Sequence, residues 1–157
     1  MNFDGEFRVN AGSADVSALL CDMSRFAPLL PTYVSHRVIF DGITDVTVAV
    51  GIGRFSGPAT VRLRLEQDGE RARYVGVGRV FRGNFDLHAN FVVTPDGHDR
   101  TLVTWDGSLN MFGRLARRFG DVVRPIALRH IDHLITGVRA TVSRPGARGL
   151  PPRSFPL

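Results

Sequence analysis

The sequence predicts an α+β domain in which a curved antiparallel sheet of seven strands wraps a long C-terminal helix. Two observations predict this class. Residues 33 to 110 show a hydrophobic period of two, broken at intervals by turn signals that contain glycine. From residue 113 onward the period changes to 3.6, which is typical of an amphipathic helix. Strands joined by such short turns must be antiparallel neighbours, because a parallel pair needs a long crossover.

Length and composition are those of an ordinary globular domain. The chain has 157 residues, of which 43% are hydrophobic, so one core is expected. No apolar run approaches the ~20 residues that cross a bilayer. The first residues lack the basic and apolar segments of a secretory signal, so a cytoplasmic location is the expectation.

The net charge of +5 is carried by arginine alone, since the chain has twenty arginines and no lysine. Guanidinium groups favour phosphate and carboxylate partners, which include membrane surfaces, acidic proteins and nucleic acids. The single cysteine, Cys21, follows two leucines and is interpreted as a small buried hydrophobe, so redox chemistry is disfavoured.

The N-terminal region predicts one strand and two short helices. A strand is expected from about residue 2 to residue 10, with Phe3, Phe7 and Val9 on one face. Ser13 or Asp15 is a candidate cap for a first helix that ends near residue 21 or 22. A second, shorter helical turn follows and is closed at residue 31 by proline.

Six further strands are expected between residues 33 and 110. Inward residues alternate with polar ones in the stretches 59–66 and 84–93, so each strand has one buried and one wet face. The predicted turns are Asp41-Gly42, Gly51-Ile52-Gly53, Asp68-Gly69, Arg82-Gly83-Asn84 and Pro95-Asp96-Gly97.

The final helix is expected to run from about residue 113 to residue 142. Steps of ~100° per residue gather an apolar stripe on one side of it and arginines on the other. The stripe is Phe119, Val122, Val123, Ile126, His130, His133 and Gly137, and the arginines are Arg114, Arg117, Arg124 and Arg139. The domain is therefore predicted to span residues 1–142, and residues 143–157, rich in Pro, Gly and Arg, to form a flexible tail.

The order of these elements resembles the helix-grip fold of the START and birch-pollen-allergen (SRPBCC) superfamily. Several stretches resemble the family of the carbon monoxide dehydrogenase G subunit more closely. They are residues 3–9 (FDGEFRV), 22–31 (DMSRFAPLLP), 50–57 (VGIGRFSG), 101–105 (TLVTW) and 113–116 (GRLA). The chain departs from the family at Ala11-Gly12, at Val16-Ser17 and at Thr32, where a glycine is common, and these changes are expected to touch the cavity entrance.

The resemblance implies an apolar cavity between sheet and helix, and a use for it. Members of the family are accessory proteins of molybdenum-containing carbon monoxide dehydrogenase and related hydroxylases, associated with the membrane and thought to carry a quinone-like molecule. This chain is therefore expected to bind a quinone or lipid in that cavity, with no other cofactor, and to bring it to a molybdenum-containing hydroxylase or to the inner face of the plasma membrane. Membrane contact is expected through the Arg face of the last helix and the tail.

The candidate ligand site combines strand and helix residues. The expected cavity wall is Phe85, Leu87, Phe91, Trp105, Phe119, Val122, Ile126, His130 and His133, and the expected entrance is Pro28, Pro31, Gly51, Gly53 and Phe55. Three roles are open for His130 and His133: core-edge residues bonded to backbone or water, polar groups that hold the ligand's head, or metal ligands. No metal site is predicted, because no further ligand accompanies the pair.

Other functions are weighed against this one. The glycines at 51, 53 and 57 superficially resemble a dinucleotide fingerprint, but no helix follows them, so they are interpreted as hairpin glycines. No catalytic residues are predicted. A polyketide cyclase-type enzyme and a ligand-free assembly factor remain as alternatives, whereas nucleic-acid binding is disfavoured because Phe85 and Phe91 fall on the inward pattern.

Overall fold

The computed structural model describes residues 1–143, and the expected tail from residue 144 onward lies outside the described residues. The elements in chain order are β1 (Asn2–Val9), α1 (Ser13–Leu20), α2 (Met23–Phe26), η1 (Ala27–Leu29), β2 (Tyr33–Phe40), β3 (Ile43–Ile52), β4 (Phe55–Asp68), β5 (Arg71–Val80), β6 (Gly83–Pro95), β7 (Thr101–Met111) and α3 (Gly113–Ser143). This order confirms the predicted α+β class. The last helix extends one residue beyond the predicted boundary.

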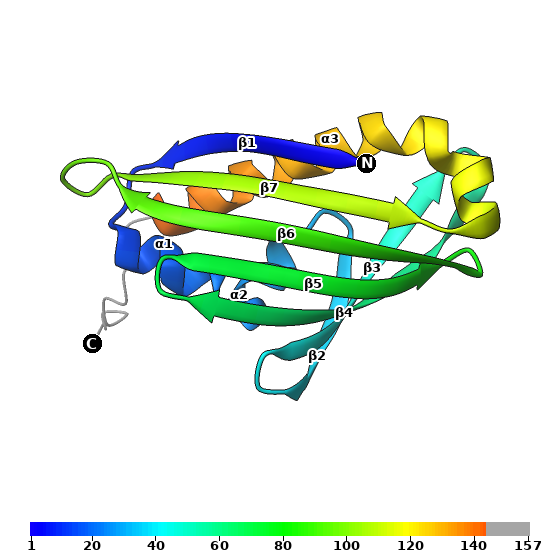
Figure 1. Cartoon of the computed structure of the whole chain (residues 1–157), viewed down its shortest axis with the longest axis horizontal. Helices are drawn as coiled ribbons and strands as arrows, with labels where there is room; N and C mark the ends of the chain where they lie inside the picture. The colour runs from blue at the N-terminus through cyan, green and yellow to red at the C-terminus, as the bar shows by residue number, and fades with distance from the viewer. Residues whose placement is uncertain (144–157) are drawn as a thin grey trace, which may run out of the picture.

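The seven strands form one antiparallel sheet in the order β1-β7-β6-β5-β4-β3-β2. Figure 1 shows the sheet curving, with α1 and α2 at one end and α3 running from the β3–β4 tip back toward α1. The register places Phe91 of β6 opposite Trp105 of β7, and Trp105 opposite Gly5 of β1. Because side chains alternate along a strand, these residues share the inner face of the sheet.

The turns follow the predicted glycines, with one shift. Gly42, Gly53 and Gly69 have positive φ, as tight hairpin turns require. The turn expected at residues 82–84 instead places Phe81 and Arg82 in the left-handed region, with φ of 50° and 62°. Gly83 is the first residue of β6, and its lack of a side chain makes room for α3, because a Cβ at this position would lie 2.8 Å from Cβ of Leu115.

Only the first of the short helices begins with a different cap from those expected. The N-cap of α1 is Gly12, which has no side chain to accept a bond, rather than Ser13 or Asp15. The N-cap of α2 is Asp22, whose carboxylate accepts a hydrogen bond of 3.1 Å from the Ser24 amide. The 3₁₀ turn η1 ends before Pro31, as predicted.

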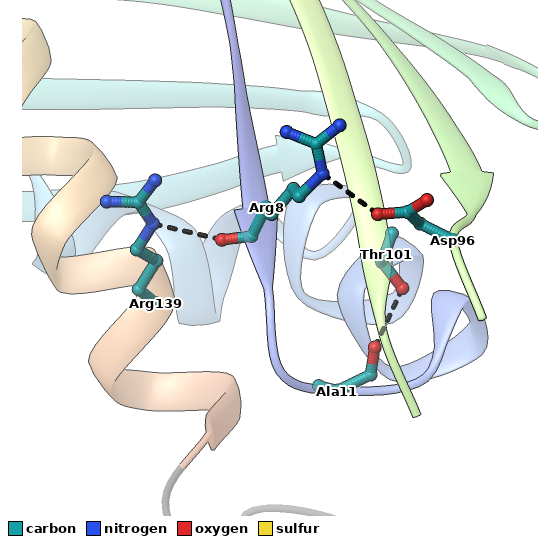
Figure 2. Close-up of polar contacts among 5 residues, drawn as sticks. All are labelled: Arg8, Ala11, Asp96, Thr101 and Arg139. Carbon is teal, nitrogen blue, oxygen red and sulfur yellow. Dashed lines mark hydrogen bonds and ion pairs between the residues drawn. The ribbon is translucent and has the colours of Figure 1, made fainter. Parts of the chain in front are cut away.

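The core lies at the end of the sheet that α1 and α2 cover. Its largest fully buried hydrophobic side chains come from β1, α1, β3, β7 and the last turns of α3, and they are Val9, Val16, Leu19, Leu20, Val46, Val103, Val138 and Val142. Thr101 is also buried, and its hydroxyl donates a hydrogen bond of 2.7 Å to the Ala11 carbonyl, as Figure 2 shows. This contact joins the start of β7 to the chain that leads into α1.

The edge strand β1 is covered by α3. The amide of Leu109 in β7 donates to the Met1 carbonyl, so the alternating carbonyls of Asn2 and Arg8 face away from β7. Arg124 donates to the Asn2 carbonyl at 3.1 Å, and Arg139 donates to the Arg8 carbonyl at 3.0 Å, the latter drawn in Figure 2. Both arginines were predicted to lie opposite the apolar stripe, and both are exposed. They also lie along the sheet edge, because α3 runs beside β1 and a guanidinium can reach its carbonyls.

The other edge strand, β2, has no such cover among the described residues. Val34, Val38 and Phe40 are exposed, Phe40 to 69%. The register of β2 against β3 shifts twice, between Tyr33 and Ser35 and between Val38 and Phe40. Such bulges twist an edge strand and make it a poorer template for pairing.

Candidate functional site

The long helix α3 is packed at its two ends and unburied between them. Leu115 and Phe119 are buried near its start, and Val138 and Val142 near its end. None of the residues from 120 to 137 is buried. We call residues 120–137 the open span of α3. Within this span Leu134 and Ile135 are half-buried and pack against the core, so the middle of α3 lies on the protein without full burial.

The inner face of the sheet is correspondingly accessible near β6 and β7. Phe85, Leu87, Phe91 and Trp105 are all half-buried and lie on this face, as their predicted role in a cavity wall requires. We use the name groove for the region between these four side chains and the open span of α3, where the resemblance implies a cavity; they line neither of the two hollows described below. Ile126, also half-buried, belongs to the open span, whereas Val122 is 46% exposed.

An aromatic cluster lies at the end of the groove where α3 begins. Phe119 packs against Phe55 with ring centroids 5.3 Å apart and against Phe81 at 5.4 Å. The guanidinium of Arg118 lies 4.5 Å from the centre of the Phe55 ring. Phe55 thus joins the β3–β4 hairpin to the helix. Of the other expected entrance residues, Gly53 lies in that hairpin turn and Gly51 near the end of β3.

A second aromatic cluster lies at the opposite end, under α2. Phe26 stacks on Tyr74 at 5.9 Å and meets Phe91 edge-on at 6.3 Å. The Tyr74 hydroxyl donates a hydrogen bond of 2.6 Å to the Leu20 carbonyl, and burial raises the pKa of Tyr74 well above its usual value. This end of the groove is therefore closed by packed rings.

A hollow of about 240 Å³ opens beside this cluster. It is lined by the start of α2 and by inner-face residues of β3 to β5, among them Thr44, Leu63 and Tyr74. Pro28 and Pro31 were expected at the entrance, but neither lines this hollow, and Pro28 is exposed. The Cys21 thiol does line it, and burial raises the pKa of Cys21, which disfavours a reactive thiolate.

His130 and His133 are both exposed on the open span, so neither is a packed core residue. Partial desolvation lowers the pKa of His130, and the neighbouring charges of Arg129 and His133 act in the same direction. His130 is thus reached by water and also partly surrounded by protein atoms, as expected for a residue at the margin of the groove. Within residues 1–143, no group of three or more His, Cys, Asp or Glu side chains is placed to hold a metal ion.

The shift at His130 predicts a pH dependence. Because the folded-state pKa lies below the ordinary value of 6.5, the folded protein disfavours the imidazolium. The contribution of His130 to stability is complete above pH 6.5 and is lost as the pH falls toward the folded-state pKa. NMR titration of the imidazole C–H resonances should give a midpoint below 6.5 for His130. A midpoint at or above that value, with the assignment checked by His130→Gln, would contradict the desolvated placement.

The indole of Trp105 lies across the neighbouring edge strand. A Cβ built on Gly5 would come within 2.9 Å of Cζ2 and 3.1 Å of Nε1 of Trp105, so only glycine leaves room for the ring. The Nε1 atom is buried and has no hydrogen-bond partner within the described residues. It is a polar group on the inner face that sequence reasoning treated only as apolar wall.

A second hollow, of about 520 Å³, lies over the outer face of β1, β7 and β6. Its lining is polar and includes Asp4, Asp106 and Asn90, and the Asn90 amide donates to the Asp106 carboxylate at 2.8 Å. The hollow is separated from the groove by the sheet itself and has no counterpart in the predicted site.

Comparison with known protein families shows the family to which this chain belongs. The family model for the G subunit of carbon monoxide dehydrogenase (CoxG) matches residues 5–143. The chain belongs to the CoxG family. This confirms the resemblance that the early proline-containing stretch and the 50–57 turn predicted. Among curated proteins, none matches the sequence.

Solved structures share the CoxG chain's fold at low sequence identity. A conserved protein from Geobacillus kaustophilus has a TM-score of 0.80 and 15% identity, covering 91% of this chain and 95% of its own. A START superfamily protein from Mycobacterium smegmatis has a TM-score of 0.68 and 14% identity, with coverages of 90% and 96%. The di-domain ARO/CYC StfQ from the steffimycin biosynthetic pathway has a TM-score of 0.63 and 16% identity, covering 94% of this chain and 46% of its own.

The departures from the CoxG pattern lie mainly outside the groove. Ala11 and Val16 are completely buried in the core, so the expectation that they touch the entrance is wrong. Thr32 has a φ of 59°, in the left-handed region that glycine adopts without strain. Its hydroxyl donates to the Ala49 carbonyl at 2.6 Å, which offsets part of that strain.

Proposed function

We propose that this CoxG-family protein binds a hydrophobic small molecule, quinone- or lipid-like, in the groove and carries it to a partner. The observation that carries the proposal is that α3 has fully buried side chains at its two ends only, Leu115 and Phe119 at one and Val138 and Val142 at the other. The half-buried apolar side chains beneath the open span offer a ligand surface that the protein itself covers only in part.

The affinity would come mainly from burial of apolar surface. Removing such surface from water contributes about 25 cal/mol per Å², and the inner-face residues Phe85, Leu87 and Trp105 supply it. The two aromatic clusters limit the groove at its ends. Exchange of the ligand would then proceed past the hollow at the start of α2 or through movement of Phe55 away from Phe119.

The partner we propose is a molybdenum-containing hydroxylase of the carbon monoxide dehydrogenase type, reached at the membrane. The family description supports the partner. Exposed Leu128 and Val122 lie among arginines on α3, which supports contact with an anionic surface at ~1 kcal/mol for each basic residue. Within residues 1–143, no helix has the length and apolar character needed to cross a bilayer.

Native mass spectrometry of the purified protein, followed by organic extraction, tests this proposal. We expect a near-stoichiometric isoprenoid quinone or lipid that dissociates on organic extraction. A protein that is purified empty and also fails to take up added quinone would contradict the carrier function. That result would favour an assembly factor that acts through its arginine surface.

A further inference from the structure

Among residues 1–143, the Trp105 indole N–H is a buried donor without an acceptor. Indole is a donor only, and buried polar groups in folded proteins nearly always find a partner. Leaving such a group unpaired destabilises the folded protein. Within the described residues nothing accepts from Nε1, although the same region satisfies the hydroxyls of Thr101 and Tyr74 with backbone carbonyls.

The position of this donor relates it to the groove. The Nε1, Cε2 and Cζ2 atoms form the edge of the ring nearest to Gly5, so the N–H lies on the β1 side of Trp105. The helix α3 meets β1 through Arg124 at Asn2 and Arg139 at Arg8. Gly5 lies midway between these two contacts. The N–H therefore lies under the stretch of α3 between residues 124 and 139, most of which belongs to the open span.

We infer that the Trp105 Nε1–H donates a hydrogen bond to an oxygen of the bound ligand. The inference rests on the proposed function and specifies its ligand class: an apolar molecule that carries an accepting oxygen, such as a ring carbonyl. A pure hydrocarbon would leave the donor unpaired, so it binds more weakly than a carbonyl compound of the same shape. The head of the ligand thus lies near β1, and its apolar remainder extends along Leu87 and Phe85.

The test uses two probes of matched shape. Menadione carries two ring carbonyls, and 2-methylnaphthalene has a similar ring system with none. Trp105 is the only tryptophan in the chain, so its indole gives a single ¹H–¹⁵N cross-peak that reports on this one group. We expect menadione to shift the indole proton resonance downfield. We expect no downfield shift with 2-methylnaphthalene.

The affinities of both probes for the Trp105→Phe variant complete the test. This change removes the N–H and part of the ring, and the loss of packing affects both probes alike. We expect menadione to lose about five- to tenfold more affinity than 2-methylnaphthalene, the size of one hydrogen bond. Comparing two probes in two proteins isolates the bond from the packing change. The cross-peak shift in the unaltered protein needs no variant and remains decisive if Trp105→Phe folds poorly.

Two outcomes would overturn the inference, and they are distinguishable. The first outcome is that both probes bind, that both lose the same affinity in Trp105→Phe, and that the indole proton shows no downfield shift. The donor role would then be wrong, and the carrier function would stand. If neither probe binds the unaltered protein and no quinone or lipid is extracted from it, both fail.

Discussion

Ile126→Trp should reduce the ligand content of the purified protein by about tenfold or more while leaving the fold intact. Ile126 is half-buried in the open span of α3, where no neighbouring residue from 120 to 137 is fully packed. A larger side chain at this position enters the groove rather than the core, so it competes with the ligand without the strain of an overpacked interior. Native mass spectrometry measures the ligand content, and circular dichroism measures the fold.

Leu128→Trp is the matched control. Residues two apart on a helix point ~200° apart, and Leu128 is 43% exposed on the outer side. The same substitution at this position should leave the ligand content unchanged. Full ligand occupancy in Ile126→Trp, or equal loss in both variants, would show that the ligand does not lie between α3 and the sheet.

Phe26→Ala should lower the free energy of unfolding by about 3–5 kcal/mol, as truncation of a buried aromatic residue usually does. Phe26 is 6% exposed and contacts the rings of both Tyr74 and Phe91. Its removal opens a cavity between α2 and the sheet, and the adjoining strands can close that cavity only partly. Urea unfolding monitored by circular dichroism measures the change.

Phe40→Ala provides the same chemical change at an exposed site. Phe40 is 69% exposed on the edge strand β2, so we expect a change within about 0.5 kcal/mol. A comparable loss of stability in both variants would show that the cluster under α2 does not anchor the core. A loss below about 1 kcal/mol in Phe26→Ala would lead to the same conclusion.

The sheet and the inner wall were predictable because they depend on local rules. A period of two separated the inward Phe85, Leu87 and Phe91 from their polar neighbours, and short glycine turns required antiparallel pairing. The register then placed Phe91 beside Trp105 without any further information. These residues were grouped correctly on one face.

The orientation of α3 was harder to predict because a helical wheel reports amphipathicity and not contact. The wheel grouped Val122 and His133 with Phe119, yet both are exposed and Phe119 is buried. The wheel placed Arg124 and Arg139 opposite the apolar stripe, and both are exposed, but the β1 carbonyls that they bind are visible only in three dimensions. The unpaired N–H of Trp105 is a similar case, since no sequence pattern shows whether a donor has an acceptor.

The arginines that cover β1 also limit how copies of this chain can associate. Edge-to-edge growth of a sheet needs two free edges in each molecule, so that every added copy offers a new one. Here Arg124 and Arg139 occupy outward carbonyls of β1, and only β2 remains uncovered among the described strands. An added strand could not use those two carbonyls, so pairing at the β1 edge is disfavoured relative to pairing at the exposed, apolar β2 edge.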